Sequence, residues 1–290
     1  MKAKQGGVAL AIVVWFIAGM SLLVAGIVSH ARTDTRTTQV HLARAKAVAS
    51  GDGAIQLAMV ERNQGFESAA AGPMISESRH RLGELEVRVQ IVPAAGFVDV
   101  NHASGDVLAA LFRLTAGMTP GDAKTVADNV LKWRQNTGAR ENRAGPRRGS
   151  REFYSLEDML RVEGVNRALL DAIRDYVVVG NWSSGRMNWS ASPGSMMQML
   201  EQVNPEQSGA VGKRRDAMFE AAAAVAGSRR LPASGVFRAD AYIGYGGRTW
   251  LRRRWLKLES GGDSSLPWRV VRTEAPRVVG LQESKGTSDV

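Results

Sequence analysis

The chain has 290 residues, a formal net charge of +10 at neutral pH and no cysteine. The lack of cysteine excludes disulfides, thiolate catalysis and cysteine metal sites, and a hydrophobic content of 44% with a charged content of 23% excludes a globally disordered chain. The basic excess would suit nucleic acid or an acidic membrane surface, but arginine is scattered through every segment, so charge alone selects neither.

The first segment is apolar, since Val8–Val28 contains no charged residue. As a helix it would span about 30 Å, the thickness of one hydrocarbon core. It is longer than the h-region of about 7–15 residues in a secretory signal, although Ser29-His30-Ala31 offers a rival signal-peptidase site. Two lysines before the run favour a cytoplasmic N-terminus. Arg32 and Arg36 after it weaken that argument.

The helical pattern continues beyond the apolar run. No proline occurs between Ser29 and Arg62, and the segment is rich in Ala, Arg, Gln and Leu, which are good or fair helix formers. One apolar face repeats at spacings of mostly three and four residues. Its members are Val40, Ala43, Ala47, Ala54, Leu57 and Ala58. We therefore expect one continuous helix over 8–62, about 80 Å long.

The opening sequence carries a family resemblance. The leader MKAKQGG followed by VALAIVVWFIAGMSLLVAG resembles the signal of type IV prepilins and pseudopilins. The resemblance implies cleavage by a prepilin peptidase between Gly7 and Val8. It also implies a mature helix, with Ile12, Trp15 and Phe16 on it, that packs against the helices of other subunits. Most pilins have glutamate at the fifth mature position, where this chain has Ile12. That departure resembles the K-class minor pseudopilins of type II secretion systems.

The remaining chain predicts an α+β fold. Residues 81–92 alternate between apolar and polar side chains and predict a half-buried strand. Several amphipathic helices follow, among them RALLDAIRDYVVV at 167–179 and RRDAMFEAAAAVA at 214–226. Three antiparallel strands with glycine turns close the chain. We expect a leader at 1–7, the pilin helix at 8–62 with its membrane part at about 8–28, the first part of an α/β module at 63–96, an inserted helical domain at 97–205, and a helix with a β-meander at 206–290.

A helical domain inserted after the first strand again resembles the K class. The matching stretches are FVDVNHASGDVLAAL, FYSLEDMLRVEGVNRALLDAIRDYVVV and RMNWSASPGSMMQML. The resemblance implies a non-enzymatic subunit at the tip of the type II pseudopilus, which serves protein export across the outer membrane. Its implied partners are the I- and J-class minor pseudopilins, the major pseudopilin and the prepilin peptidase. The implied location is the bacterial inner membrane, with one membrane pass and the C-terminal domain in the periplasm, and the new N-terminus is expected to be methylated.

No catalytic motif is present in the sequence. The four histidines (His30, His41, His80 and His102) are far apart, and we predict surface or structural roles for them. The same prediction applies to the carboxylates Asp99, Asp106, Asp122 and Asp128, whose spacing fits no compact calcium loop. The K class includes calcium-binding members, so the resemblance leaves calcium open as a ligand. The nearest candidate carboxylates in the β-region are Asp240, Glu259 and Asp263, and no motif singles them out.

The alternative function is a membrane-anchored DNA-binding protein of the competence type. LEDMLRVEGVNRALLDAIRDYV has the form of a helix-hairpin-helix, a motif that presents backbone N–H groups of two glycines to a phosphate. Here the turn is Gly164-Val165-Asn166, which lacks the second glycine, and the preceding helix pair contains Pro120, which has no N–H. We therefore favour protein packing over nucleic-acid binding.

A basic strand is the last candidate site. Arg248, Arg252, Arg253, Arg254 and Lys257 accompany Trp250 and Trp255 on it. The strand could stack single-stranded nucleic acid or contact an acidic partner. We favour a third interpretation, a solvated face whose two tryptophans pack on opposite sides of the sheet.

Overall fold

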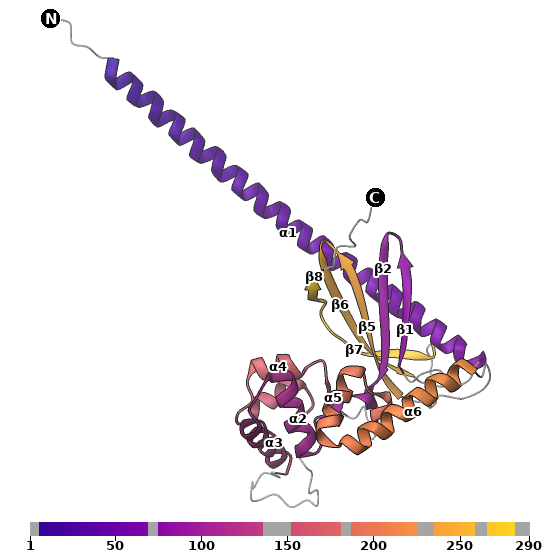
Figure 1. The fold of residues 1–290 in the computed structure, drawn as a ribbon. Helices are drawn as coiled ribbons and strands as arrows, with labels where there is room; N and C mark the ends of the chain where they lie inside the picture. The colour runs from indigo at the N-terminus through magenta and orange to yellow at the C-terminus, as the bar shows by residue number, and fades with distance from the viewer. Residues whose placement is uncertain are drawn as a thin grey trace, which may run out of the picture.

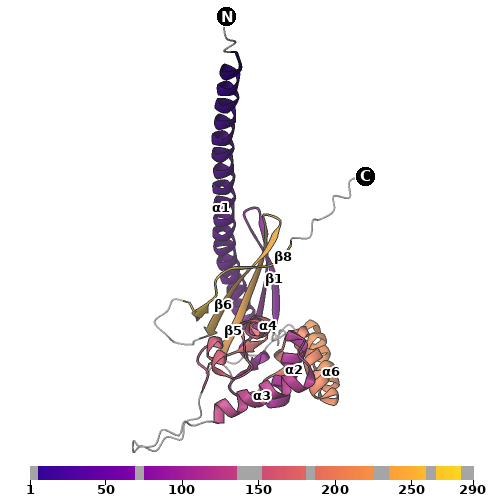
Figure 2. The same ribbon diagram turned by 90° about the vertical axis from the view of Figure 1, so that its left-hand side faces the viewer.

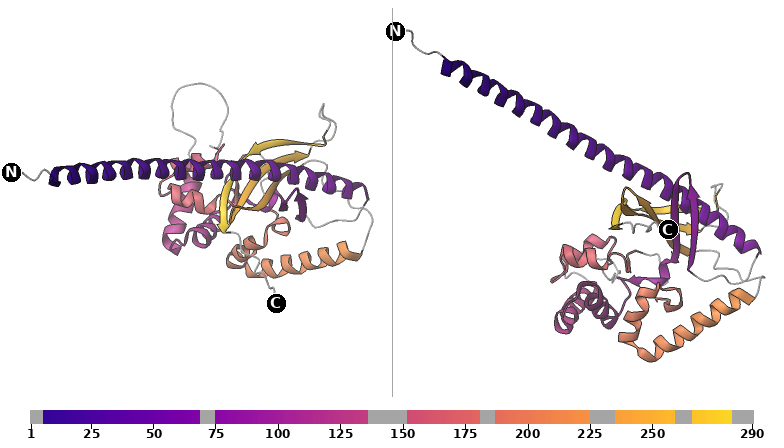
Figure 3. Two further views of the ribbon diagram at one scale, coloured as in Figure 1. Left: turned by 90° about the horizontal axis from the view of Figure 1, so that it is seen from above. Right: turned by 45° about the horizontal axis from the view of Figure 1, so that its top comes forward.

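The computed structural model describes residues 6–68, 75–135, 152–180, 187–224, 235–258 and 266–281. It has the predicted α+β architecture, with a long N-terminal helix, an antiparallel sheet and a mostly helical domain (Figure 1). The sheet, the part of the long helix that packs on it and the helical domain together form what we call the head. The rest of the long helix leaves the head and continues alone toward the N-terminus (Figure 3).

Helix α1 (Gly6–Ser68) contains 63 residues and extends about 95 Å. It therefore covers the predicted range 8–62 and exceeds it at both ends. Just after the apolar run, four threonine hydroxyls donate to the carbonyl oxygens four residues earlier, at 2.8–3.0 Å. This satisfies the hydroxyls inside the helix and lets these β-branched residues stay in it. The four are Thr33, Thr35, Thr37 and Thr38.

The main sheet has six strands, all paired antiparallel. They are β1 (Ser76–Leu82), β2 (Leu85–Pro93), β5 (Gly235–Tyr245), β6 (Arg248–Leu258), β7 (Trp268–Thr273) and β8 (Arg277–Leu281). The spatial order is β1-β2-β5-β6-β7, and β8 continues the same edge by pairing with the first part of β6. Strand β8 was not predicted from the sequence.

The predicted single strand over 81–92 is wrong in one respect, since the structure forms a hairpin there. Strands β1 and β2 meet at a turn in which Gly83 has a φ of 61°. This left-handed conformation is open to glycine at no steric cost, so the chain reverses at Gly83-Glu84. The helical domain consequently follows two strands, and β2 alone continues the alternating pattern of the prediction.

Alternate residues of the central strands face opposite sides of the sheet, as the strand period of two requires. One side packs against the second half of α1. From α1 the core contains Ala43, Ala47, Ala54, Ile55, Ala58 and Met59. From the sheet it contains Val87, Val89, Ile91, Phe237, Ala239, Ala241, Ile243, Trp250, Leu256 and Trp268. Four of the six residues predicted for this helix face are buried, whereas Val40 and Leu57 are each 44% exposed.

The helical domain lies between β2 and β5 in the sequence. Its α-helices are α2 (Gly105–Ala116), α3 (Pro120–Gln135), α4 (Arg167–Ile173), α5 (Gly194–Val203) and α6 (Pro205–Ala224). Its 3₁₀ helices are η1 (Ala94–Gly96), η2 (Leu156–Arg161) and η3 (Trp189–Ala191), and β3 (Val98–Asp99) pairs parallel with β4 (Val177–Val178). The domain has its own core, in which Trp133 stacks on Phe153 with ring centroids 4.1 Å apart.

Two predicted helices have different bounds in the structure. The helix expected to include Val177–Val179 ends at Ile173, because the β-branched valines that follow pair with β3 instead. The helix expected to begin at Arg214 begins at Pro205. Proline is favoured at the first position of a helix, and the Asn204 side chain accepts a hydrogen bond from the Gln207 N–H at 3.0 Å, which caps that end.

The helical domain occupies the end of the head that lies away from the N-terminus, as two perpendicular views show (Figures 1 and 2). The opposite end of the head carries the β1–β2 and β5–β6 turns and faces the free part of α1. The head therefore has two distinct ends, one toward the apolar segment and one formed by the inserted domain.

Candidate functional site

The first half of α1 is an exposed apolar rod. Its large side chains from Leu10 to Val28 are all more than 40% exposed, and Ile12, Trp15 and Phe16 are 63%, 81% and 67% exposed. Among the described residues, α1 is the one helix that is long and apolar enough to cross a membrane. An apolar surface of this size needs lipid or other apolar helices around it. The structure therefore presents α1 as a membrane-anchor candidate.

The predicted cleavage bond lies at the start of this rod. Gly7 and Val8 belong to the first turns of α1, which begins at Gly6. A peptidase needs an extended substrate, so this turn would have to open. Gly6 and Gly7 make opening easy, because each lowers helix stability by about 1 kcal/mol relative to alanine. The cleavage site remains a prediction.

The second half of α1 lies close to the sheet because its packed face is made of small residues. Ala47 and Ala54 are completely buried there, and Gly51 lies between them. A Cβ atom built on Gly51 would lie 2.6 Å from the Cβ of Arg252 on β6, closer than real side chains approach. The helix–sheet distance at this level thus requires glycine.

Beside Gly51, the acidic side chain of Asp52 connects α1 to β6. The Arg252 guanidinium donates to both carboxylate oxygens of Asp52, with Nε–Oδ1 at 2.7 Å and Nη2–Oδ2 at 3.1 Å. Arg254 Nη2 donates to the same carboxylate. Bidentate arginine–carboxylate pairs fix geometry as well as charge, so these contacts hold α1 in register on the sheet.

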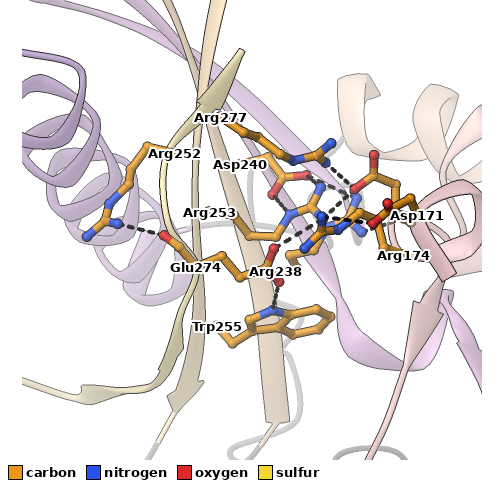
Figure 4. A network of polar contacts seen from close by, with 10 residues as sticks. Asp171, Arg174, Arg238, Asp240, Arg252, Arg253, Trp255, Glu274 and Arg277 are labelled. Carbon is orange, nitrogen blue, oxygen red and sulfur yellow. Dashed lines mark hydrogen bonds and ion pairs between the residues drawn. The ribbon is translucent and has the colours of Figure 1, made fainter. Parts of the chain in front are cut away.

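On the other face of the sheet, a second group of charges connects the sheet to the helical domain (Figure 4). Arg253, 3% exposed, donates to both oxygens of Asp240 at 2.6 and 2.9 Å, and Asp240 also pairs with Arg238 at 3.0 Å. Asp175, which follows α4 in the helical domain, accepts from Arg253 at 2.6 Å and from Arg277 on β8. We call these five residues the arginine network.

The arginine network has a marked effect on the pKa of Asp175. Burial alone would raise this pKa, but the nearby guanidinium groups of Arg253 and Arg277 outweigh burial and lower it to about 2. Burial lowers the pKa of Arg238 to about 10, while the carboxylate of Asp240 raises that of Arg253 against the effect of burial. Asp175, Arg238 and Arg253 are therefore charged at neutral pH, and the ion pairs hold the five residues in place.

These contacts correct the predicted solvated basic strand. Arg252 and Arg253 are buried and their guanidinium groups pair inside the molecule, so neither is presented to a nucleic acid or an acidic partner. The prediction for the tryptophans is confirmed. Trp250 packs in the core against α1, and Trp255 packs in a separate cluster on the opposite face. Sequence reasoning missed Asp52 and Asp175, the residues that pair with these arginines.

Of the three candidate carboxylates in the β-region, the structure describes only Asp240. Both oxygens of Asp240 accept from arginines, while Glu259 and Asp263 lie outside the described residues. Within the described ranges, no group of three or more histidine or acidic side chains is placed to hold a metal ion. Both carboxylate oxygens of Asp240 already accept hydrogen bonds from guanidinium groups, so Asp240 does not fit a metal ligand.

The histidines and the remaining acids lie on the surface or contact neighbouring groups of the fold. His30 and His41 are exposed on α1, and His80 is buried with Nε2 2.8 Å from the Ser78 hydroxyl. His102 Nδ1 lies 2.9 Å from the carboxylate of Asp99, which also accepts from the Asn101 N–H. Asp106 and Asp122 lie in the first turns of α2 and α3, where acids favour the helix dipole, and Asp128 pairs with Lys124 at 3.6 Å.

The hairpin around Gly164 packs against α3 at the surface of the helical domain. Gly164 has a φ of 87°, and a Cβ there would lie 2.8 Å from Val126 Cγ2 of α3. Asn129 of α3 donates to the Glu163 carbonyl at 3.1 Å, and the Val165 N–H donates within the turn. The element before the turn is a short 3₁₀ helix. The glycine is thus explained by packing, and the DNA-binding alternative is not favoured.

No family model matches this sequence, and no curated protein matches it. Among solved structures, the fold is similar to a chain of the GspK–GspI–GspJ complex from the type 2 secretion system of enterotoxigenic Escherichia coli. The two chains are 13% identical, and the match covers 85% of this chain and 99% of the other with a TM-score of 0.41. A similarity of this size carries no functional argument by itself.

Proposed function

We propose that this chain is a minor pseudopilin of a type II secretion system, of the K class, with a structural and non-enzymatic role at the pseudopilus tip. One observation carries the proposal. An exposed apolar segment continues without a break into a helix that forms part of a folded head, and that head holds a helical domain inserted between β2 and β5. A simple membrane anchor needs no such continuous connection to its head.

The firm attachment of α1 to the head suits a filament subunit, because a movement of the helix is passed on to the head. The close contact at Gly51 and the bidentate Asp52–Arg252 pair fix α1 on the sheet. After cleavage before Val8, the apolar half of α1 would pack against the corresponding helices of other pseudopilins. The head would then follow any movement of its helix as one body.

The inserted domain favours an end position. It covers the end of the head that points away from the N-terminus (Figure 2). In a filament whose helices all run in one direction, a subunit stacked above would meet this domain. Ile12 is consistent with a position at the tip. Inside the membrane an acidic side chain would pair with the N-terminal amine of the subunit above, which a tip subunit does not have, whereas isoleucine cannot form this pair.

The proposed partners and location follow from the same role. The partners are the I- and J-class minor pseudopilins, the major pseudopilin and the prepilin peptidase, after whose cut the new N-terminus at Val8 is methylated. The chain would cross the bacterial inner membrane once before assembly, with the head in the periplasm.

The test is the N-terminal residue and mass of the chain from cells with an active prepilin peptidase. We expect a chain that begins at Val8 and retains the apolar helix. Gly7→Leu should leave an uncut, membrane-held precursor, because the peptidase accepts a small residue before the cut. Gly19→Ala, within the membrane segment, is the matched control and should be processed normally. Efficient processing of Gly7→Leu, an intact Met1 or a start at Arg32 or Thr33 would contradict the proposal.

A further inference from the structure

A groove lies where α1 meets the end of the head that faces the apolar segment. It has a volume of about 460 Å³, and its walls come from α1 and from the β5–β6 hairpin. Arg36 and Arg248 line it from the two sides, and Val40, Ala43 and Trp250 add apolar surface. The groove therefore combines two cationic side chains with an apolar wall.

The arginines at this groove are available for a ligand. Arg32 and Arg36 are one helical turn apart and share the face of α1 that lines the groove, whereas Asp34 is turned about 200° away from each. Within the described part of the chain, neither of these arginines nor Arg248 forms an ion pair, and all three are exposed. By contrast, the neighbouring Arg252 pairs with Asp52.

The membrane-facing end of the groove lies within side-chain reach of the lipid head groups. Arg32 and Arg36 follow Val28, the last residue of the apolar run, by about 6 and 12 Å along the helix axis. The head-group layer adds about 5–7 Å on each side of the hydrocarbon core, and a flexible arginine side chain reaches back several ångströms by snorkelling. Arg36 and Arg248 are thus within reach of phosphates once α1 spans the bilayer.

We propose that this groove binds the phosphate head group of an anionic phospholipid in the leaflet from which α1 emerges. Arg36 and Arg248 donate to the phosphate oxygens from the two walls, Arg32 adds charge on the membrane side, and Val40 and Trp250 line the groove on the side away from the membrane. Guanidinium groups match phosphate geometry by bidentate donation. The inference rests on the proposed membrane insertion of α1. It gives the basic residues after the apolar run a binding role.

The test uses the full chain, reconstituted in vesicles of equal parts phosphatidylglycerol and phosphatidylcholine and released in mild detergent. Native mass spectrometry then counts the lipids retained. We expect preferential retention of phosphatidylglycerol. The Arg36→Gln/Arg248→Gln variant should lower the ratio of phosphatidylglycerol to phosphatidylcholine by about 30-fold, because each arginine contributes about fivefold near an anionic surface. The control is Arg113→Gln/Arg167→Gln, which removes the same charge from exposed positions of the helical domain and should leave the ratio within about twofold.

Three results would overturn the inference. They are no preference for phosphatidylglycerol in the unchanged chain, equal losses in the two double variants, and release of the retained lipid by inorganic phosphate, which would indicate a site for a free anion. Alkaline carbonate extraction of the vesicles distinguishes a failure of the lipid-binding proposal from a failure of the proposed function. A chain that stays in the membrane without lipid preference contradicts only the groove, whereas a chain that is extracted also contradicts membrane insertion of α1.

Discussion

Replacement of Asp175 by asparagine is the most direct test of how the helical domain is held on the sheet. Asp175 belongs to the helical domain, while Arg253 and Arg277, from which it accepts hydrogen bonds, belong to β6 and β8. Asp175→Asn keeps the size of the side chain and removes its charge. The arginine network then has three cations and one anion, Asp240, around a largely buried contact.

The size of the effect follows from the pKa of Asp175. A folded-state pKa of about 2 against an ordinary value of 3.8 corresponds to about 2.5 kcal/mol of stability. Because the side chain is 37% exposed, solvent screening reduces this to about 1–2 kcal/mol. The folded-state pKa is lowered, so the contribution is complete above pH 3.8 and is lost as the pH falls toward 2.

The assay is urea unfolding of the full chain in detergent micelles, followed by near-ultraviolet circular dichroism at several pH values. Asp175→Asn should lower the free energy of unfolding by about 1–2 kcal/mol at pH 7, and the difference from the unchanged chain should shrink toward zero between pH 4 and pH 2. Asp171→Asn is the matched control, since Asp171 lies one turn away and makes only an exposed pair with Arg174 at 3.5 Å. The reasoning is refuted if the two variants lose equal stability, or if the loss in Asp175→Asn does not change with pH.

Two glycine substitutions test the packing of the head, each with a glycine control, and thermal unfolding in detergent measures both. Gly51→Ala should destabilise the head by about 1–3 kcal/mol, because the added methyl group overlaps β6. The control is Gly53→Ala, whose Cβ would lie 3.4 Å from its nearest neighbour and which should be neutral or stabilise the helix slightly. A Gly51→Ala variant as stable as Gly53→Ala would contradict the close helix–sheet contact. Gly164→Ala combines a positive φ with a clash against α3 and should lower stability more than Gly117→Ala, which has a positive φ in open space. Equal losses in these two variants would show that the clash is not real.

The sequence predicted those parts of the fold that local patterns specify. A run without proline and with apolar residues at helical spacing predicted one long helix, and α1 has that form. Alternation predicted β2 and the three strands β5, β6 and β7. The short strand β8 was missed because its five residues carry no alternating pattern, and the hairpin at Gly83 was missed because β1 is polar except for Leu82 and carries no apolar alternation.

The candidate site was predicted in part for a similar reason. The exposed apolar segment with Ile12, Trp15 and Phe16 could be recognised, because a run of uncharged residues is visible without any tertiary contact. The role of the basic strand could not, because the strand period shows which residues share a face but not what covers that face. A row of arginines on a strand is the same pattern whether water, a partner or an internal carboxylate faces it.

Residues close together in the chain specify the long apolar helix, the meander of strands and the helical insertion, so these three features could be predicted without tertiary contacts. Tertiary contacts place Arg252 and Arg253 of β6 inside the molecule. Arg252 pairs with Asp52, 200 residues earlier, and Arg253 with Asp175, 78 residues earlier. Ion pairs depend on distance in space, and burial of a guanidinium is stable only when folding brings a carboxylate to it.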